Sequence, residues 1–501
     1  MVGTVIAPGL SAEPMQSRGS FNLFVADPDK VGMVHMWYRA QLNATDGHRF
    51  FLKGHKDMRH DKLLDLWRDT TTLFADIHEG DDDTGAVVAR GILTITPEDF
   101  AQQLRSMRAT GTDSTAEQLK AKARFGTAFA AELLHTYGGV AAGPRLIDDN
   151  APPRKKRPLR APAPTLHPFT TDDGVELLLT RYRGGAKGPV LVAHGLGVSS
   201  LIFTIDTIGT NLVEYLCANG YDVWLLDFRA SIVLPASRTR YTADDIAEYD
   251  YPAAVREVRR HTGAPSVQVV AHCFGSTTFI CAMLAGLQDV RAAVCSQIAT
   301  HLVVPRITSI KSGLHVPDVL DRLGLHTLSA DAHTKERFLQ RVFDRALESW
   351  PMPEQEECDS AVCRRITFLY ALLYEHDQLN TLTHDAALGE MFGVASITAF
   401  KHLATMVRHG TVVGADGSDR YLPHLDRLAL PLTIIHGAKN VCFLPESTEK
   451  TMAALSAANG PDWYRRHLIP NYGHIDCIFG THASTDVYPR ILEGLGPTAE
   501  L

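Results

Sequence analysis

The sequence lacks several features that mark specialised classes of protein. It has no uninterrupted apolar run of the roughly 20 residues that a membrane-spanning helix needs. Its first residues, MVGTVIAPGLSAEPM, contain neither a basic stretch nor a continuous apolar stretch, so they are not typical of a signal peptide. The formal net charge is -8, which disfavours nucleic acid and anionic membranes as partners. These absences favour a cytoplasmic protein.

Cysteines and nucleotide-binding motifs are also sparse. The 8 cysteines are scattered through the chain and do not form the dense framework of small secreted domains. Cys358 and Cys363 are separated by four residues, but no matching second pair follows, so no metal site is expected. No G-x-G-x-x-G motif follows a strand candidate, and we therefore expect no dinucleotide or other cofactor.

A segment rich in proline and basic residues, APPRKKRPLRAPAP (151–164), divides the chain. This composition favours a stiff, solvated linker. Before it, residues 1–150 contain five strand candidates between residues 21 and 97, followed by two helical patterns. We expect a smaller β-rich α+β accessory domain here and a catalytic domain over residues 165–501.

From residue 165 onward, short apolar runs alternate with helical patterns. The runs include PVLVAHG, YDVWLLDF, SVQVVAH, RAAVCSQI and PLTIIHG. Nearly continuous apolar strands joined by helices indicate a mostly parallel sheet with helices on both faces. Residues 304–428 interrupt the alternation and are too long for a simple connection. We expect this stretch to form an inserted helical cap over a site.

The strongest chemical signal is SVQVVAHCFGSTTF (266–279), where an apolar strand passes through Cys273 directly into a helix. A strand-to-helix turn of the G-x-S-x-G kind presents a nucleophile above a sheet, and small neighbours let the backbone bend. Ala271 and Gly275 hold the two small positions. A helix N-terminus also favours the thiolate. Cys273 is therefore the predicted nucleophile, ahead of a purely structural cysteine, whereas Ser276 lies inside the helix.

Two further loops supply a predicted base and oxyanion hole. His474, in NYGHIDCIFG, follows the last strand candidate and is the predicted general base. The strand VLVA ends in HGLG (194–197), whose backbone amides can face the nucleophile. We expect the amides of Leu196 and Phe274 to bind the oxyanion. His194 itself is expected to be structural.

The residue that orients His474 is less clearly marked. Asn440 follows the strand PLTIIHG, at the position where this kind of site usually carries an aspartate. A Cys–His pair can rest as thiolate and imidazolium, so an asparagine suffices to orient the ring. We therefore predict Asn440 as the third catalytic residue. The alternative is that Asn440 only forms a turn and that Glu446 supplies a carboxylate.

Taken together, residues 165–498 resemble the α/β-hydrolase superfamily, and within it the acid-lipase-like branch. YTADDIAEYDYPAAV (241–255) is similar to the segment that those lipases carry before the elbow strand, and NYGHIDCIFG is similar to their histidine loop. The resemblance implies an α/β-hydrolase fold that hydrolyses or transfers an acyl group. Cysteine at the elbow is also seen in dienelactone hydrolases and polyhydroxyalkanoate synthases, which adds lactones and thioesters to the expected substrates.

Residues 20–140 resemble the segment after the flavin domain in cholesterol-oxidase-like proteins of the GMC oxidoreductase group. That flavin domain is absent here, so the resemblance implies a flavin oxidoreductase as a partner. The sequence as a whole predicts a hydrolase that acts on a small ester, lactone or thioester through an acyl-Cys273 intermediate. Acyl transfer at the same site and a non-catalytic, hydrolase-like scaffold are the alternatives.

Overall fold

The computed structural model describes residues 1–59, 66–137, 153–297, 300–305, 326–330, 358 and 360–496. The chain divides into two compact units, residues 1–145 with 351–359, and residues 146–350 with 360–501. None of the helices within the described ranges is long and apolar enough to cross a membrane.

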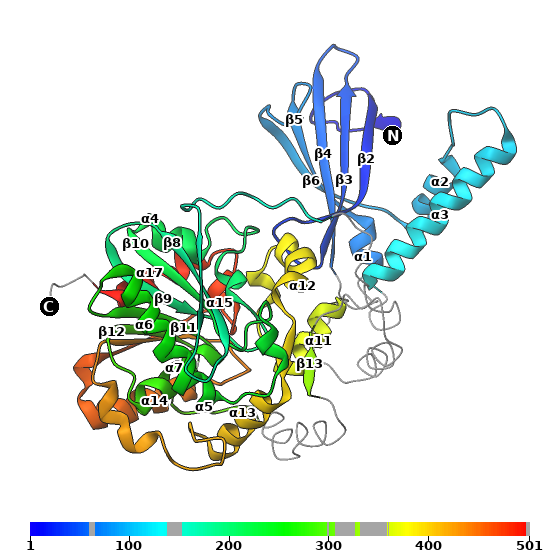
Figure 1. Cartoon of the computed structure of the whole chain (residues 1–501). Coiled ribbons are helices and arrows are strands. Elements are labelled where there is room, and N and C mark those ends of the chain that lie inside the picture. The colour runs from blue at the N-terminus through cyan, green and yellow to red at the C-terminus, as the bar shows by residue number, and fades with distance from the viewer. Residues whose placement is uncertain are drawn as a thin grey trace. The chain divides into compact units, whose positions relative to one another are not determined.

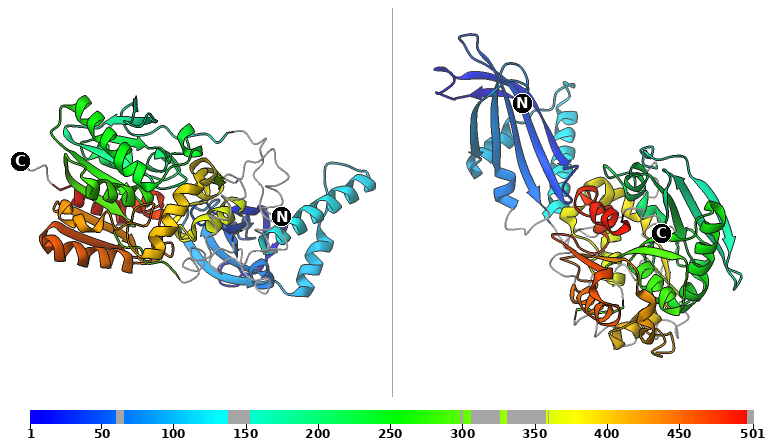
Figure 2. Two further views of the ribbon diagram at one scale, coloured as in Figure 1. Left: turned by 60° about the horizontal axis from the view of Figure 1, so that its bottom comes forward. Right: turned by 90° about the vertical axis from the view of Figure 1, so that its left-hand side faces the viewer.

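The first unit is built on a twisted antiparallel sheet of six strands in the order β1-β2-β3-β4-β5-β6 (Figures 1 and 2). The strands are Val2–Val5, Met15–Ala26, Met33–Asn43, Arg49–Arg59, Thr72–Glu79 and Val87–Thr94. Helices α1 (Leu66–Thr71), α2 (Pro97–Ser106) and α3 (Thr115–Tyr137) complete it. The side chain of Tyr137 in α3 packs with Met36 and Met58 of the sheet. The β-rich α+β prediction is confirmed, although strand β1 had no clear sequence signal.

The second unit contains an eight-stranded sheet in the order β16-β15-β12-β11-β9-β10-β8-β7 (Figure 1). Only the hairpin β7–β8 and the β8–β10 pair are antiparallel. Helices α4 and α17 pack against the sheet, and so do α6, α7 and α14. The predicted mostly parallel sheet is confirmed. Its strands are Thr165–Thr170, Glu176–Arg183, Lys187–Ala193, Tyr221–Asp227, Val267–His272, Val290–Ser296, Leu432–Gly437 and Tyr464–Ile469, and the helices are Leu212–Ala218, Tyr488–Leu495, Tyr251–Thr262, Phe274–Ala285 and Glu446–Asn459.

Burial explains why the central strands are apolar along their whole length. Every residue of β10, β11 and β15 is buried, because helices cover both faces of the sheet. Helix α7 is buried from Phe274 to Leu284 and carries almost no polar face. The elbow before α7 is therefore fixed on both sides by the core of this unit.

The inserted region lies between β12 and β15. Its described elements are β13 (Thr327–Ser329), α11 (Ala361–Tyr370), η7 (His376–Gln378), η8 (Thr383–Ala387), α12 (Leu388–Met391), β14 (Val394–Ser396), α13 (Ile397–His409) and η9 (Leu422–Leu428). The part drawn in yellow lies along one side of the second unit (Figure 2). The Leu373 carbonyl accepts hydrogen bonds from the backbone amides of His474 and Ile475, and the amide of Gly393 donates to Gly197. The insertion thus contacts two of the loops predicted to form the site.

The basic segment before β7 is not free in solvent as its composition suggested. Arg154 pairs with Asp206 at 2.6 Å and with Glu390 at 2.8 Å, and Arg157 pairs with Glu214 at 2.6 Å. Burial alone would raise the pKa of Glu214, but hydrogen bonds from Arg157 and from backbone amides lower it to about 2. The prediction of a fully solvated linker is wrong at Arg154 and Arg157, because carboxylates of the second unit bind these two arginines.

Candidate active site

Cys273 occupies a strained turn between β11 and α7. Its backbone angles are φ 56° and ψ -124°. Residues other than glycine rarely adopt this conformation, and those that do are concentrated at functional sites. The turn depends on small neighbours. A Cβ on Gly275 would lie 2.2 Å from the carbonyl oxygen of His194, and one on Gly195 would lie 3.3 Å from the Cys273 sulfur. The structure therefore has the predicted elbow, with the thiol where the strand ends.

Two backbone amides lie close enough to the thiol of Cys273 to lower its pKa. They belong to Phe274 and Leu196, the residues predicted to form an oxyanion hole. Burial raises the pKa of the Cys273 thiol to about 12, although the two amides act to lower it. The sequence argument expected a lowered pKa at the helix N-terminus, and this was wrong, because loss of hydration outweighs the stabilisation that the amides provide.

His474 lies on the loop between β16 and α15 (Asp476–Phe479), fully buried. The sulfur of Cys273 and one ring nitrogen from each of His474 and His272 all lie within 4.8 Å of one another. The Nε2 atom of His474 has no hydrogen-bond partner among the described residues. Burial, together with the nearby rings of His272 and His436, holds the pKa of His474 well below its usual range. Both the thiol and the imidazole are therefore neutral at pH 7.

Asn440 is the residue that the structure places against His474. Its Nδ2 donates to Nδ1 of His474 at 3.0 Å and to Oε1 of Gln297 at 2.9 Å. Its Oδ1 accepts from the backbone amides of Cys442 at 2.9 Å and Phe443 at 3.1 Å. The alternative residue, Glu446, is exposed at the start of α14.

Gln297 is a site residue that the sequence reasoning missed. It directly follows β12, and its Oε1 accepts from the backbone amide of Gly437 at 3.1 Å as well as from Asn440. Because the Gly437 amide can only donate, it fixes which end of the Gln297 side chain faces Asn440. A polar residue at the carboxyl end of a buried parallel strand was the signal that could have identified Gln297.

His272 was also missed as a neighbour of the site. Its ring lies 5.2 Å from that of His474, and its Nδ1 is 3.2 Å from the hydroxyl of Ser296. Burial and the nearby His194 lower the pKa of His272 to about 3, so the ring is neutral. His194 stacks on Phe228 at 4.3 Å, as expected of a structural histidine.

A buried carboxyl group holds the histidine loop. Oδ2 of Asp476 accepts from the backbone amides of Gly473 at 2.8 Å and Glu375 at 3.2 Å. Burial raises the pKa of Asp476 to about 7. Asp476 thus joins the His474 loop to the inserted region.

Tyr370, the last residue of α11, reaches the oxyanion loop from the insertion. A Cβ on Gly197 would lie 1.8 Å from its hydroxyl, and the φ of Gly197 is 73°, so this position requires glycine. The Tyr370 hydroxyl is buried and has no hydrogen-bond partner among the described residues.

Comparison with known proteins places these features in a family. The profile described as alpha/beta hydrolase fold matches residues 188–481. Lipase lipl-1 of Caenorhabditis elegans is 24% identical over 361 residues, which are 66% of this chain and 87% of that lipase. Lipase member K of Homo sapiens is 23% identical over 355 residues, which are 64% and 85% of the two chains. Among solved structures, a hydrolase from Pseudomonas aeruginosa is 16% identical with a TM-score of 0.40, covering 66% of this chain and 98% of that one. The chain belongs to the α/β-hydrolase-fold family.

Proposed function

We propose that this chain hydrolyses or transfers an acyl group through a covalent thioester on Cys273. The observation that carries the proposal is the pair of amides, from Leu196 and Phe274, that lie beside the sulfur at the strained elbow. A carbonyl carbon bonded to that sulfur holds its oxygen near the same amides. Amides arranged in this way stabilise the negative charge that develops on the oxygen.

In the proposed acylation step, the Cys273 sulfur bonds to the acyl carbon and the thiol proton passes to Nε2 of His474. The carbon–oxygen or carbon–sulfur bond of the substrate breaks, and the leaving group takes that proton from His474 and departs as an alcohol or a thiol. Water or another acceptor then gives a proton to His474 and attacks the thioester, which releases the acyl group and restores the thiol.

Asn440 limits how well His474 can act as a base. Because Nδ1 accepts a hydrogen bond from Asn440, the proton of the neutral ring resides on Nε2. The ring must move this proton to Nδ1 before Nε2 can accept one from Cys273, and the resulting Nδ1–H would face the Asn440 amide. We therefore propose thioesters as the preferred class, since a thiolate is a weaker base than an alkoxide and leaves with less help from His474. Esters and lactones rank behind them, including the esters that the lipase relatives would suggest.

Intact-mass measurement after incubation with an aryl thioester, an aryl ester and a lactone tests the proposal. Wild-type protein should gain the mass of one acyl group, fastest from the thioester. Cys273→Ala should gain none, and Cys217→Ala, which removes a buried cysteine elsewhere, should behave like the wild type. Equal acylation of Cys273→Ala would contradict the proposal.

Acyl transfer follows from the same intermediate. A weak base activates water slowly, so the thioester persists long enough to meet other acceptors. Adding a small thiol or alcohol to the acylated protein should shorten its lifetime and produce the corresponding ester or thioester. If the lifetime is unchanged by any acceptor, the protein is a hydrolase alone.

The neutral state of Cys273 and His474 also favours a second candidate, a non-catalytic scaffold that binds an oxidoreductase partner. The pKa of about 12 for Cys273 suits a thiol that stays protonated at pH 7. This candidate predicts no acylation of wild-type protein by any of the three substrates. It also predicts that strengthening the base by Asn440→Asp leaves the protein inert.

A further inference from the structure

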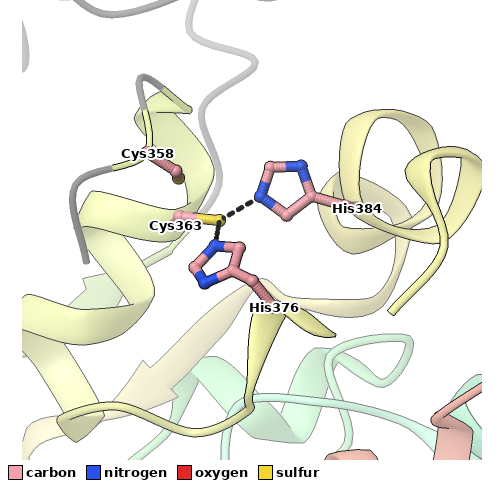
Figure 3. Close-up of side chains that lie close together, drawn as sticks. All are labelled: Cys358, Cys363, His376 and His384. Atoms are coloured by element: carbon pink, nitrogen blue, oxygen red, sulfur yellow. Dashed lines mark hydrogen bonds between the residues drawn. The ribbon is translucent and has the colours of Figure 1, made fainter. Parts of the chain in front are cut away.

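A second cluster of nucleophilic side chains lies in the inserted region, apart from the site described above. One donor atom from each of Cys358, Cys363, His376 and His384 lies within 4.8 Å of every other. The sulfur of Cys363 is 2.9 Å from Nε2 of His384 and 3.8 Å from Nε2 of His376 (Figure 3). The sequence has no second cysteine pair to match Cys358 and Cys363, so it predicted no metal site here. The two histidines take the place of that pair.

Local structure explains why these residues meet. Ser360 caps α11, which places Cys363 in the first turn of that helix. His376 belongs to the short helix η7, and His384 to η8. Figure 3 shows a ring nitrogen of His376 and one of His384 directed at the Cys363 sulfur, so that these three segments meet there. Cys358 is five residues before Cys363, so the chain itself keeps its sulfur within reach of the same point.

The surroundings are those of a metal site rather than of a packed core. Nδ1 of His384 donates to the carboxylate of Asp385 at 2.6 Å, which leaves the lone pair of Nε2 directed at the cluster. Histidines that bind metals commonly have such a carboxylate on their second nitrogen. The hydroxyl of Tyr374 is 2.7 Å from the Cys363 sulfur and can donate to a thiolate. Cys363 and His384 are buried, whereas Cys358 and His376 are partly exposed.

We propose that Cys363, His376 and His384, with Cys358 as the fourth ligand, bind a zinc ion. Two thiolates and two neutral imidazoles cancel the charge of Zn²⁺, which suits a partly buried site. Zn–S and Zn–N distances of about 2.3 and 2.0 Å in a tetrahedron separate a sulfur from a nitrogen by about 3.5 Å. The distance of 3.8 Å between the Cys363 sulfur and Nε2 of His376 is close to this value. The distance of 2.9 Å between the same sulfur and Nε2 of His384 would increase slightly when the ion binds.

Four protein ligands leave no open position, so the zinc is structural. Its role follows from the segment that carries His376. Three residues earlier, the carbonyl of Leu373 accepts the backbone hydrogen bonds of His474 and Ile475. One residue earlier, the amide of Glu375 donates to Asp476. An ion on His376 therefore anchors the stretch of the insertion that supports the loop of His474.

The test is zinc stoichiometry in the full-length chain, freed of any purification tag and prepared without chelators. We expect one zinc per chain in the wild type and less than one tenth in Cys363→Ser and His384→Ala. Cys217→Ser, which alters a buried cysteine outside the cluster, should keep its zinc. Chelation should lower the Tm of the wild type by several degrees, and added Zn²⁺ should restore it. A wild type that takes up no zinc, even after incubation with excess Zn²⁺, would overturn the proposal.

Two further measurements keep the test decisive if Cys363→Ser fails to fold. His376→Gln removes one ligand and spares both sulfurs, and should weaken zinc retention during dialysis by at least 10-fold. Retention equal to that of the wild type would count against the site. Cobalt substituted for zinc should show the visible absorption of a tetrahedral thiolate complex. Unreduced protein without zinc could instead lack two hydrogens in its mass, which would indicate a Cys358–Cys363 disulfide. That result would overturn the zinc proposal.

Discussion

Asn440 donates a hydrogen bond to His474, from Nδ2 to Nδ1 at 3.0 Å, so the orienting residue is a hydrogen-bond donor to the ring and not an acceptor. The direction is set by the backbone. The amides of Cys442 and Phe443 both donate to Oδ1 of Asn440, which leaves only its Nδ2 to face the imidazole. Turning the side chain over would break both of these bonds and the bond to Gln297. An aspartate at this position would reverse the polarity of the contact.

Asn440→Asp should therefore increase the rate at which Cys273 is acylated. A carboxylate accepts from Nδ1–H, which frees Nε2 to take the thiol proton and stabilises the imidazolium. We expect a gain of roughly 10-fold in the acylation rate. The gain stays below the full contribution of a general base, because a carboxylate oxygen of the new aspartate would face Oε1 of Gln297, which is also an acceptor. Stopped-flow acylation with an aryl thioester measures it. Asn440→Ala is the matched control and should be slower than the wild type.

Cys273→Ser should lose nearly all activity in the present site. A hydroxyl ionises far less readily than a thiol and depends on a strong base, which Asn440 and His474 do not provide. We expect acylation by an aryl ester to fall at least about 100-fold. The double change Cys273→Ser with Asn440→Asp should recover part of this loss. A single Cys273→Ser variant as fast as the wild type would show that His474 is already a competent base.

The positions of the elbow, of the histidine loop and of the Leu196 and Phe274 amides beside Cys273 could be predicted, because each depends on local sequence. Cys273 lies between an apolar strand and a helix, and His474 follows the last strand. The direction of the Asn440 hydrogen bond could not be predicted, since it depends on amides of Cys442 and Phe443 and on Gln297, which is 143 residues away. The zinc ligands escaped for a similar reason, because His376 and His384 approach Cys363 only when the insertion folds.

Alkylation of Cys273 should depend steeply on pH. With a pKa of about 12, the thiolate fraction grows about 10-fold per unit from pH 7 to pH 11. Iodoacetamide labelling of this residue, followed by peptide mass spectrometry, should rise throughout that range. A plateau near pH 8.5, the value of an ordinary thiol, would contradict the effect of burial. Cys273→Ala provides the baseline for labelling of the other cysteines.

Asp476 should make stability depend on pH. Its pKa rises from 3.8 to about 7 in the folded protein, so the folded state binds more protons than the unfolded state between these values. The contribution of Asp476 is fully present below about pH 4 and is lost as the pH rises through 7, with a slope of up to about 1.4 kcal/mol per pH unit. Asp476→Asn keeps an acceptor for the Gly473 amide and removes the titration. Urea unfolding of both proteins at pH 5 and pH 8 should show the stability of the wild type falling relative to the variant.

The anchored basic segment should resist trypsin until its carboxylate partners are removed. Glu214, only 2% exposed, binds Arg157 and accepts from the backbone amide of Arg160 at 2.7 Å. Glu214→Gln weakens both contacts, so cleavage by trypsin after Arg160 should become several-fold faster. The peptide bond after Arg157 is not cleaved in either protein, because Pro158 follows it. The matched control is Glu257→Gln, which removes a carboxylate that pairs with Arg260 on α6. Since the pKa of Glu214 is lowered to about 2, its stabilisation is present above about pH 4.5 and is lost only as the pH falls toward 2. Cleavage after Arg160 at equal rates in the wild type and Glu214→Gln at pH 8 would show that these ion pairs do not hold the segment.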